Sequence, residues 1–159
     1  MHIWRIDKWK KYYEGINVRS GLWLRFDREV DPEVKRACKE FCCWLRKKYY
    51  FPVRVPVYIR NKYKVKAFDG EMVKAFFGYY QERSHEPYVS VAVGDYSRVL
   101  NKWGKDNALS SILGSIAHEL THYFQWINGL ELTERGEERQ ANTYVDYIMD
   151  EYKETHDHP

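Results

Sequence analysis

The chain has 159 residues, of which 44% are hydrophobic and 31% are charged, and its formal net charge at pH 7 is +3. A chain of this length and composition is expected to form one domain, residues 1–159, with a hydrophobic core. The small net charge gives no indication of a nucleic-acid partner, and no stretch of about 20 apolar residues is present that would cross a membrane.

The cysteines and the first residues bear on where the protein is located. Cys38, Cys42 and Cys43 are odd in number and lie close together in the sequence, which argues against a secreted disulfide framework and for a reducing compartment. Residues 1–15 contain no apolar segment of the kind that signal peptides carry. We therefore expect a cytoplasmic protein, whose cysteines pack in a core rather than bind a metal.

Local sequence patterns predict the structure of the first 50 residues. Residues 1–20 are basic and aromatic, which predicts either packing against the body of the protein or a surface for a partner. Residues 22–26 predict a short strand. A helix is predicted from Pro32 to about Tyr49, because Asp31 can cap its first turn and proline is favoured at its first position.

Three further segments are predicted to form strands. Residues 53–59 alternate between apolar and polar side chains, although Pro56 would require an edge strand or a bulge. Residues 75–81 and 88–93 are joined by a short polar link, so they are expected to pair as an antiparallel hairpin. With the predicted helices they indicate an α+β fold with a small mixed or antiparallel sheet. Residues 95–106 are predicted to be a loop.

A long helix is predicted over residues 108–129. Asp106 or Asn107 could cap its first turn, and Asn128 followed by Gly129 is typical of a helix end. Apolar residues recur along one face at spacings of three or four positions, at Ile112, Ile116, Leu120, Phe124 and Ile127.

This helix contains the pattern H-E-x-x-H, formed by His118, Glu119 and His122. Residues four positions apart lie on the same side of a helix, so both imidazoles can reach one zinc ion at roughly 2.0–2.1 Å. Glu119 would lie beside the metal without binding it, where its carboxylate can take a proton from the attacking water. The alternative is a helix with two unrelated histidines, which the rarity of the pattern disfavours.

A catalytic zinc site needs a third protein ligand and leaves the fourth position to water. No histidine follows His122 at the spacing typical of metzincins. A last helix, predicted over about residues 137–152, offers Glu137 and Glu138, and Glu134 lies just before it; helical periodicity does not choose between Glu137 and Glu138. The tail histidines, His156 and His158, could also bind a metal, although a frayed and solvated end is the simpler interpretation.

The segments HELTH (residues 118–122) and EERQAN (residues 137–142) together resemble the gluzincin metallopeptidases, especially the small gluzincins and the ImmA/IrrE-like group. In these families a second helix supplies a glutamate in an E-x-x-A-[DN] pattern. The resemblance implies a zincin-like fold in which His118, His122 and Glu138 bind Zn²⁺ and Glu119 is the general base. It also implies that Asn142 supports a ligand histidine, in a place where aspartate is commoner.

The function implied by this resemblance is zinc-dependent hydrolysis of a peptide bond. The substrate, a peptide or a protein, would lie along a strand edge, for which residues 75–81 are the candidate. Two alternatives stay open: an ImmA-like regulatory zinc protein with low turnover, and a zinc-stabilised binding module without catalysis. Glu119 disfavours the binding module, because a structural zinc site needs no base, whereas a fourth protein ligand from the tail would favour it.

Overall fold

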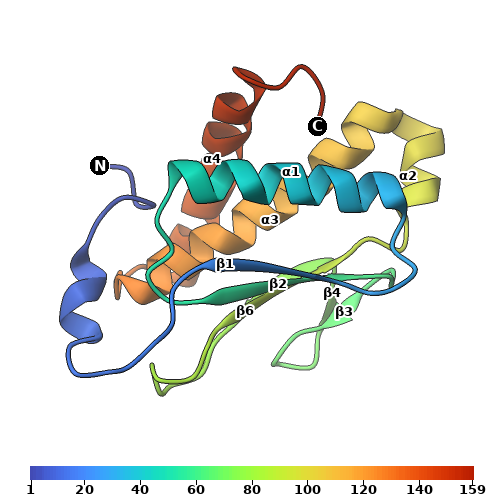
Figure 1. Ribbon diagram of the computed structural model, residues 1–159. Helices are drawn as coiled ribbons and strands as arrows, with labels where there is room; N and C mark the ends of the chain where they lie inside the picture. Colours follow the sequence, from blue (N-terminus) through green and yellow to red (C-terminus); the bar gives the residue numbers. More distant parts are fainter.

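The computed structural model describes residues 1–159 and has a four-stranded sheet, a separate two-stranded sheet and four α-helices. Helices α1 and α3 lie over one face of the four-stranded sheet, and α4 packs against α3 (Figure 1). No helix has the length and apolar character that crossing a membrane requires. In chain order the elements are a 3-10 helix (Lys8–Tyr12), β1 (Leu22–Phe26), α1 (Pro32–Lys48), β2 (Val55–Arg60), β3 (Val65–Lys66), β4 (Met72–Val73), β5 (Ala75–Gly78), β6 (Tyr88–Ala92), α2 (Tyr96–Trp103), α3 (Lys105–Ile127) and α4 (Glu134–Lys153).

The four-stranded sheet has the order β1-β2-β6-β5. β1, β2 and β6 run parallel to one another, whereas β5 pairs antiparallel with β6, with Phe77 opposite Val89. The predicted α+β class is confirmed, the sheet is mixed, and the expected hairpin is present as β5 and β6. β5 is an edge strand, and it ends at Gly78 rather than continuing to residue 81.

The prediction that Pro56 requires an edge strand or a bulge is wrong, because β2 lies between β1 and β6. The amide of Val55 donates to the carbonyl of Gly21 at 2.9 Å, so Val55 faces β1 and the next residue, Pro56, faces β6. Pairing between β2 and β6 begins only at Val57. The proline therefore lies just before that ladder, where its missing amide costs no ladder hydrogen bond.

Helix α1 begins as predicted, with the Asp31 carboxylate accepting a hydrogen bond from the amide of Glu33 at 2.8 Å. Two of the three cysteines lie in its buried face, whereas Cys43 is exposed. Burial raises the pKa of the Cys42 thiol to about 12, so this thiol stays protonated and packs as an apolar group. The full buried face consists of Val34, Ala37, Cys38, Phe41, Cys42 and Leu45.

The loop predicted over residues 95–106 is wrong, because this segment contains helix α2. A helix of 8 residues is too short to show a clear period in the sequence. The chain then turns at Gly104, whose φ of 86° favours glycine, and α3 begins at the next residue. Neither Asp106 nor Asn107 caps α3; the Asn107 side chain donates instead to the carbonyl of Trp103 at 2.8 Å.

Helix α3 ends at Ile127, and the predicted Asn128-Gly129 pair follows directly, with a φ of 58° at Gly129. A Cβ atom at this position would lie 2.5 Å from the hydroxyl oxygen of Tyr12, so the N-terminal segment also requires glycine here. Most of the predicted apolar stripe of α3 is buried, namely Ile116, Leu120, Phe124 and Ile127.

Residues 1–20 pack against the body of the protein, which is the first of the two expectations for this segment. Trp4 is buried, and its indole N–H donates to the hydroxyl of Thr121 at 3.1 Å. The amide of Trp9 donates to the side-chain oxygen of Asn128 at 2.9 Å. Both contacts fix the N-terminal segment to the second half of α3.

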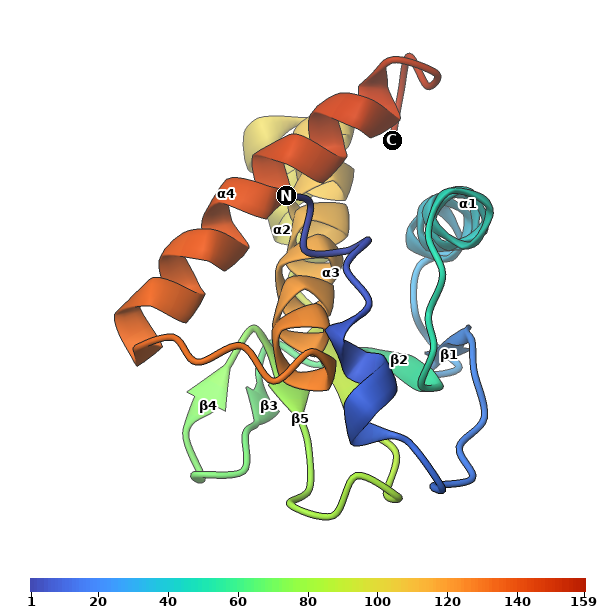
Figure 2. The same cartoon turned by 90° about the vertical axis from the view of Figure 1, so that its left-hand side faces the viewer.

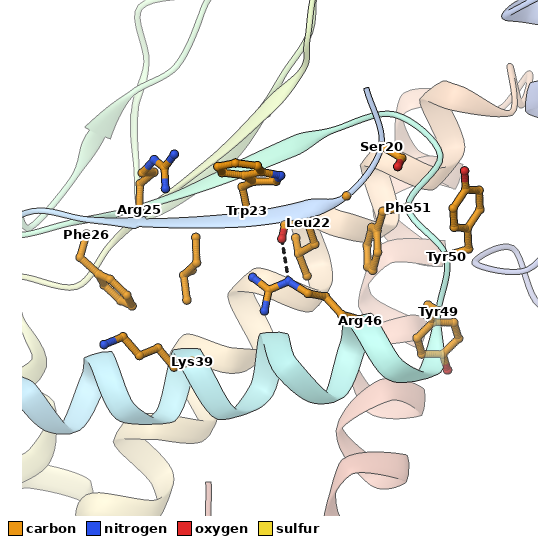
Figure 3. A pocket seen from close by; sticks show the side chains of 12 residues that line it. Ser20, Leu22, Trp23, Arg25, Phe26, Lys39, Arg46, Tyr49, Tyr50 and Phe51 are labelled. Carbon is orange, nitrogen blue, oxygen red and sulfur yellow. Dashed lines mark hydrogen bonds between the residues drawn. The ribbon is translucent and has the colours of Figure 1, made fainter. Parts of the chain in front are cut away.

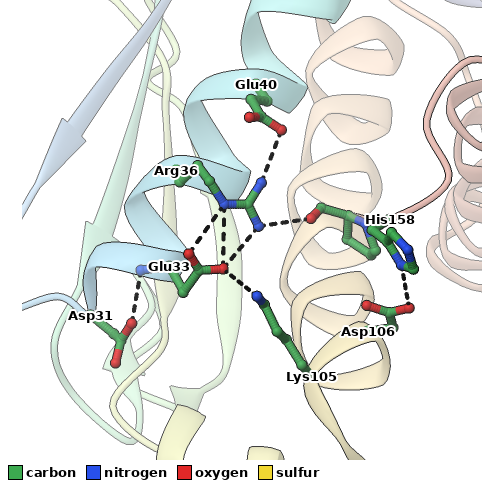
Figure 4. A network of polar contacts seen from close by, with 8 residues as sticks. Asp31, Glu33, Arg36, Glu40, Lys105, Asp106 and His158 are labelled. Carbon is green, nitrogen blue, oxygen red and sulfur yellow. Dashed lines mark hydrogen bonds and ion pairs between the residues drawn. The ribbon is translucent and has the colours of Figure 1, made fainter.

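The tail also folds back onto the protein, as Figure 4 shows, so it is not frayed as expected, although the side chain of His158 stays solvated at 77% exposure. The Nδ1 atom of His158 lies 2.9 Å from a carboxylate oxygen of Asp106, near the start of α3. Arg36 on α1 contacts Glu33 at 3.1 Å and donates to the backbone oxygen of Pro159 at 3.0 Å. These contacts join the tail to α1 and to the start of α3.

One buried hydroxyl is expected to contribute strongly to stability. The hydroxyl of Tyr123 on α3 donates to the carbonyl of Val53 at 2.5 Å and accepts from its amide at 3.0 Å, and the residue is fully buried. Tyr123→Phe should lower the free energy of unfolding by about 1–3 kcal/mol, because both backbone groups lose their partner in a dry environment. Urea denaturation measures the loss. In the exposed control Tyr147→Phe the change should stay below about 0.5 kcal/mol, and equal losses in the two variants would contradict this account.

Candidate metal centre

The H-E-x-x-H segment lies in the second half of α3, where α4 crosses it. Figure 2 shows α4 running diagonally past α3, with its first turns toward β4 and β5. His118 and His122 lie next to each other on α3, with their ring centroids 4.9 Å apart. Glu138 lies near the start of α4, so the two helices bring together residues that are far apart in the sequence.

The carboxylate of Glu138 contacts both imidazoles. One oxygen lies 2.9 Å from Nε2 of His122, and the other lies 3.2 Å from Nε2 of His118. One ligand atom from each of the three residues lies within 4.8 Å of the others, so they form a group that could hold a metal ion. The ligands of a tetrahedral zinc ion, bound at about 2.0–2.1 Å, lie roughly 3.3 Å from one another, which these separations approach.

Helix α4 starts at Glu134, three residues earlier than the sequence predicted, so Glu138 lies beyond its first turn. The hydroxyl of Thr133 caps the helix by accepting from the amide of Gly136 at 3.0 Å. Small residues then allow the close approach of the two helices. Ala141 is fully buried, and a Cβ atom at Gly114 would lie 3.3 Å from a methyl group of Val145.

His118 is in an environment that favours its neutral form. Desolvation by burial is the largest effect on its pKa, followed by the neighbouring His122; both lower the pKa, and they outweigh the opposing effect of Glu138. A neutral imidazole has the free lone pair that a metal ligand needs. The surroundings of His118 therefore suit metal binding.

Glu119 is buried beside this group, with a carboxylate oxygen 3.9 Å from Nε2 of His118. Desolvation by burial, together with the charge of Glu138, raises the pKa of Glu119 to about 8. The nearby backbone amide of Phe77 on β5 lowers this pKa, but by less than the other effects raise it. A carboxyl group that ionises near neutral pH can both accept and donate a proton.

The raised pKa predicts how the metal-free protein responds to pH. The pKa of Glu119 changes from 4.5 in its ordinary state to about 8 in the fold, so the folded state loses stability as the pH rises through this range. Glu119→Gln has no such loss. The free energy of unfolding of the variant, relative to that of the parent, should therefore rise by up to roughly 4 kcal/mol as the pH is raised from about 5 to about 9. Urea denaturation with a chelator present measures this difference. A difference in unfolding free energy that does not change with pH would contradict the prediction.

Gln125 also belongs to this site, although the sequence analysis did not identify it. Its side-chain oxygen lies 2.8 Å from Nδ1 of His122, and its side-chain nitrogen donates to the carbonyl of Glu137 at 3.0 Å and to the side-chain oxygen of Gln140 at 2.9 Å. The signal in the sequence was a polar residue three positions after the second histidine, within a mostly apolar stretch. Residues at this spacing are neighbours on a helix.

Asn142, which was expected to support a ligand histidine, lies on α4 one turn beyond Glu138. The side chain of Asn142 raises the pKa of His118, as the smallest of the effects on that group. Asn142 is therefore near His118, whereas Gln125 contacts His122.

Two cavities extend along β5 from the group formed by His118, His122 and Glu138. One, of about 750 Å³, is lined by Glu119, His122 and Glu138, and the other, of about 420 Å³, is lined by His118 and Glu119. Ala75 lines both cavities. A groove therefore passes the candidate centre on both sides of Glu119.

The free edge of β5 borders this groove. The amide of Ala92 on β6 donates to the carbonyl of Lys74 at 2.7 Å, and alternate residues of an antiparallel strand bond to the same neighbour. Ala75 and Phe77 therefore direct their backbone groups away from β6, toward the open edge. The lowering effect of the Phe77 amide on the pKa of Glu119 agrees with this direction.

The tail histidines do not reach the candidate centre. His158 pairs with Asp106, and about 18 Å of helix lies between Asp106 and His118. His156 stacks on Tyr152, with their ring centroids 4.0 Å apart. The group that could hold a metal therefore has three protein side chains, and neither the tail nor the cysteines contribute to it.

A separate groove of about 680 Å³ lies between β1 and α1, at the opposite edge of the sheet (Figure 3). Its lining contains no histidine and no carboxylate. The guanidinium of Arg46 donates to the carbonyl of Leu22 at 2.7 Å and so occupies a backbone group of this edge strand. The residues that could hold a metal ion therefore lie near the β5 edge and not at this one.

Comparison with known proteins gives no independent assignment. The chain matches no protein-family model, and no curated protein matches it at a significant level.

Proposed function

We propose that the protein is a zinc-dependent metallopeptidase of the gluzincin type, which hydrolyses peptide bonds in a peptide or protein substrate. The observation that carries this proposal is the contact of Glu138 with both His118 and His122, beside the buried carboxylate of Glu119. The motifs HELTH and EERQAN, which carry the resemblance to gluzincins, supply all four of these residues.

The donor set fits zinc. Two imidazole nitrogens and one carboxylate oxygen are ligands that catalytic zinc sites use, and three protein ligands leave one position for water or substrate. When bound, zinc would polarise the attacking water and the carbonyl of the scissile bond.

Glu119 would move the proton during hydrolysis. Its carboxylate would accept a proton from the attacking water and then donate it to the nitrogen of the leaving amine. The buried position suits both steps, because a carboxylate in an apolar environment accepts a proton more readily than one in water.

The free edge of β5 would hold the substrate. An extended peptide can add to a sheet edge through main-chain hydrogen bonds, and here Ala75 and Phe77 present their backbone groups next to Glu119. Side chains of such a peptide would extend into the two cavities that border the centre. Asn142 would support His118 by a neutral hydrogen bond, which is weaker than the charged contact of an aspartate.

The zinc-stabilised binding module receives less support. A structural site is normally closed by four protein ligands, whereas this group has three side chains and a buried carboxylate that a purely structural ion does not need. Three ligand side chains beside a groove support an open site rather than a closed one.

The proposal is tested on the purified protein by zinc analysis and by cleavage of a mixed peptide library. We expect about one zinc per chain, cleavage at peptide bonds, loss of cleavage after chelation and recovery after zinc is added back. A protein that binds zinc at this site without cleaving any peptide would instead support the regulatory or binding alternatives. A protein that binds no zinc would contradict the proposal.

A further inference from the structure

We infer that Gln125 is a positioning residue that holds His122 in the tautomer with its proton on Nδ1, and thereby leaves Nε2 free to bind a metal. The inference rests on the proposed metal site but does not depend on the hydrolytic reaction. It assigns to Gln125 on α3 the support of His122, while Asn142 on α4 lies near the other histidine.

The orientation of the Gln125 amide follows from its partners. One end of this amide lies 3.0 Å from the backbone carbonyl of Glu137, and a backbone carbonyl can only accept a hydrogen bond. The end that faces it must therefore be the NH₂ group. The same NH₂ group donates its second proton to the side-chain oxygen of Gln140 at 2.9 Å.

The tautomer of His122 follows from that orientation. With its NH₂ group committed to α4, Gln125 can present only its carbonyl oxygen to Nδ1 of His122, at 2.8 Å. This oxygen is an acceptor, so Nδ1 must carry the proton, and the neutral imidazole then has its lone pair on Nε2. It is Nε2 that faces Glu138, at 2.9 Å.

The same amide also positions the third candidate ligand. Gln125 is 3% exposed, so solvent cannot replace its hydrogen bonds. Its partner Glu137 immediately precedes Glu138, so one side chain connects a candidate ligand on α3 to the turn of α4 that carries another. Outer partners of this kind orient imidazole ligands, and their loss typically weakens metal binding by roughly 10–100-fold.

A purely structural role would consist only of holding α3 against α4, and it would not affect the tautomer. Three variants separate the roles. Gln125→Leu removes the acceptor for His122 and the donor to α4. Gln125→Glu keeps an acceptor for His122 but removes the donor. Gln140→Leu is the matched control, because it removes one partner of the amide and leaves the Glu137 carbonyl in place.

The primary measurement is ¹⁵N NMR of the His122 ring in metal-free protein at about pH 8, where an ordinary imidazole is neutral. In this measurement every protein, the parent included, also carries Glu138→Ala, because the Glu138 carboxylate 2.9 Å from Nε2 would otherwise draw a proton onto that nitrogen. We expect the Nδ1–H tautomer in the parent, in Gln140→Leu and in Gln125→Glu, and a mixture of tautomers in Gln125→Leu. A parent without the Nδ1–H tautomer would overturn the inference, as would a folded Gln125→Leu that keeps it unchanged. If Gln125→Leu does not fold, the tautomer of His122 in Gln125→Glu tests the inference instead. A mixture of tautomers in that variant would also overturn the inference.

Zinc affinity provides the second measurement. We expect Gln125→Leu to bind zinc roughly 10–100-fold more weakly than the parent, and Gln140→Leu to stay within about 3-fold. An altered tautomer with unchanged zinc affinity would overturn the link to metal binding. A parent that binds no zinc would contradict the proposed function, whereas the NMR result would still show whether Gln125 fixes the tautomer.

Discussion

Glu119→Gln should reduce peptide hydrolysis by roughly 10²–10⁴-fold while the zinc content stays at the parent level. Glutamine has almost the same shape as glutamate, but its amide cannot take a proton from the attacking water. Metal binding should persist, because Glu119 lies outside the His118, His122 and Glu138 group that could hold the ion. Loss of activity without loss of zinc is therefore the expected signature of a proton-transfer group.

The measurement combines zinc analysis with initial rates on a peptide identified from the library. Glu154→Gln is the matched control, because it makes the same chemical change in an exposed glutamate that lines neither cavity. Its rate should stay within about 2-fold of the parent. A Glu119→Gln variant that cleaves as fast as the parent would show that the mechanism proposed for Glu119 is wrong.

Glu138→Ala should weaken zinc binding by at least about 100-fold, because the loss of an outer partner alone typically costs 10–100-fold and Glu138 is proposed as a ligand. Glu137→Ala should bind zinc at nearly the parent level. The two residues are adjacent in sequence, yet only Glu138 contacts both imidazoles in the structure. Glu137 instead lies in the first turn of α4, where a negative charge favours the helix dipole.

A competitive titration with a chromophoric chelator measures both zinc affinities, and circular dichroism checks that each variant is folded. Because both substitutions replace a glutamate by alanine in the same helix, differences in helix propensity cancel between them. The opposite ranking would move the third ligand to Glu137 and would remove the basis for the alignment of α4 with the gluzincin pattern.

The candidate centre could be predicted from the sequence where the signal was local. His118 and His122 lie four positions apart on one helix, so helical geometry alone brings them together. The third member of the group could not be predicted in this way. Helical periodicity left Glu137 and Glu138 equivalent, and only the resemblance to gluzincins favoured Glu138. The structure distinguishes them because the packing of α4 on α3 places the Glu138 carboxylate, and not that of Glu137, against the histidines.

The features that the sequence did not reveal depend on tertiary contacts. Helix α2 is short, and its period is too brief to distinguish it from a loop. The acceptable position of Pro56 in a central strand depends on where the pairing with β6 begins. Gln125 was missed because its role appears only when the carbonyl of Glu137, on another helix, is placed beside it.

The most direct test of the central claim is a crystal structure of the zinc-loaded protein, with anomalous diffraction measured at the zinc absorption edge. The account predicts one strong anomalous peak at roughly 2.0–2.2 Å from Nε2 of His118, Nε2 of His122 and a carboxylate oxygen of Glu138, with no fourth protein ligand. A principal peak at any other residues, such as Cys43 or the tail histidines, would contradict it.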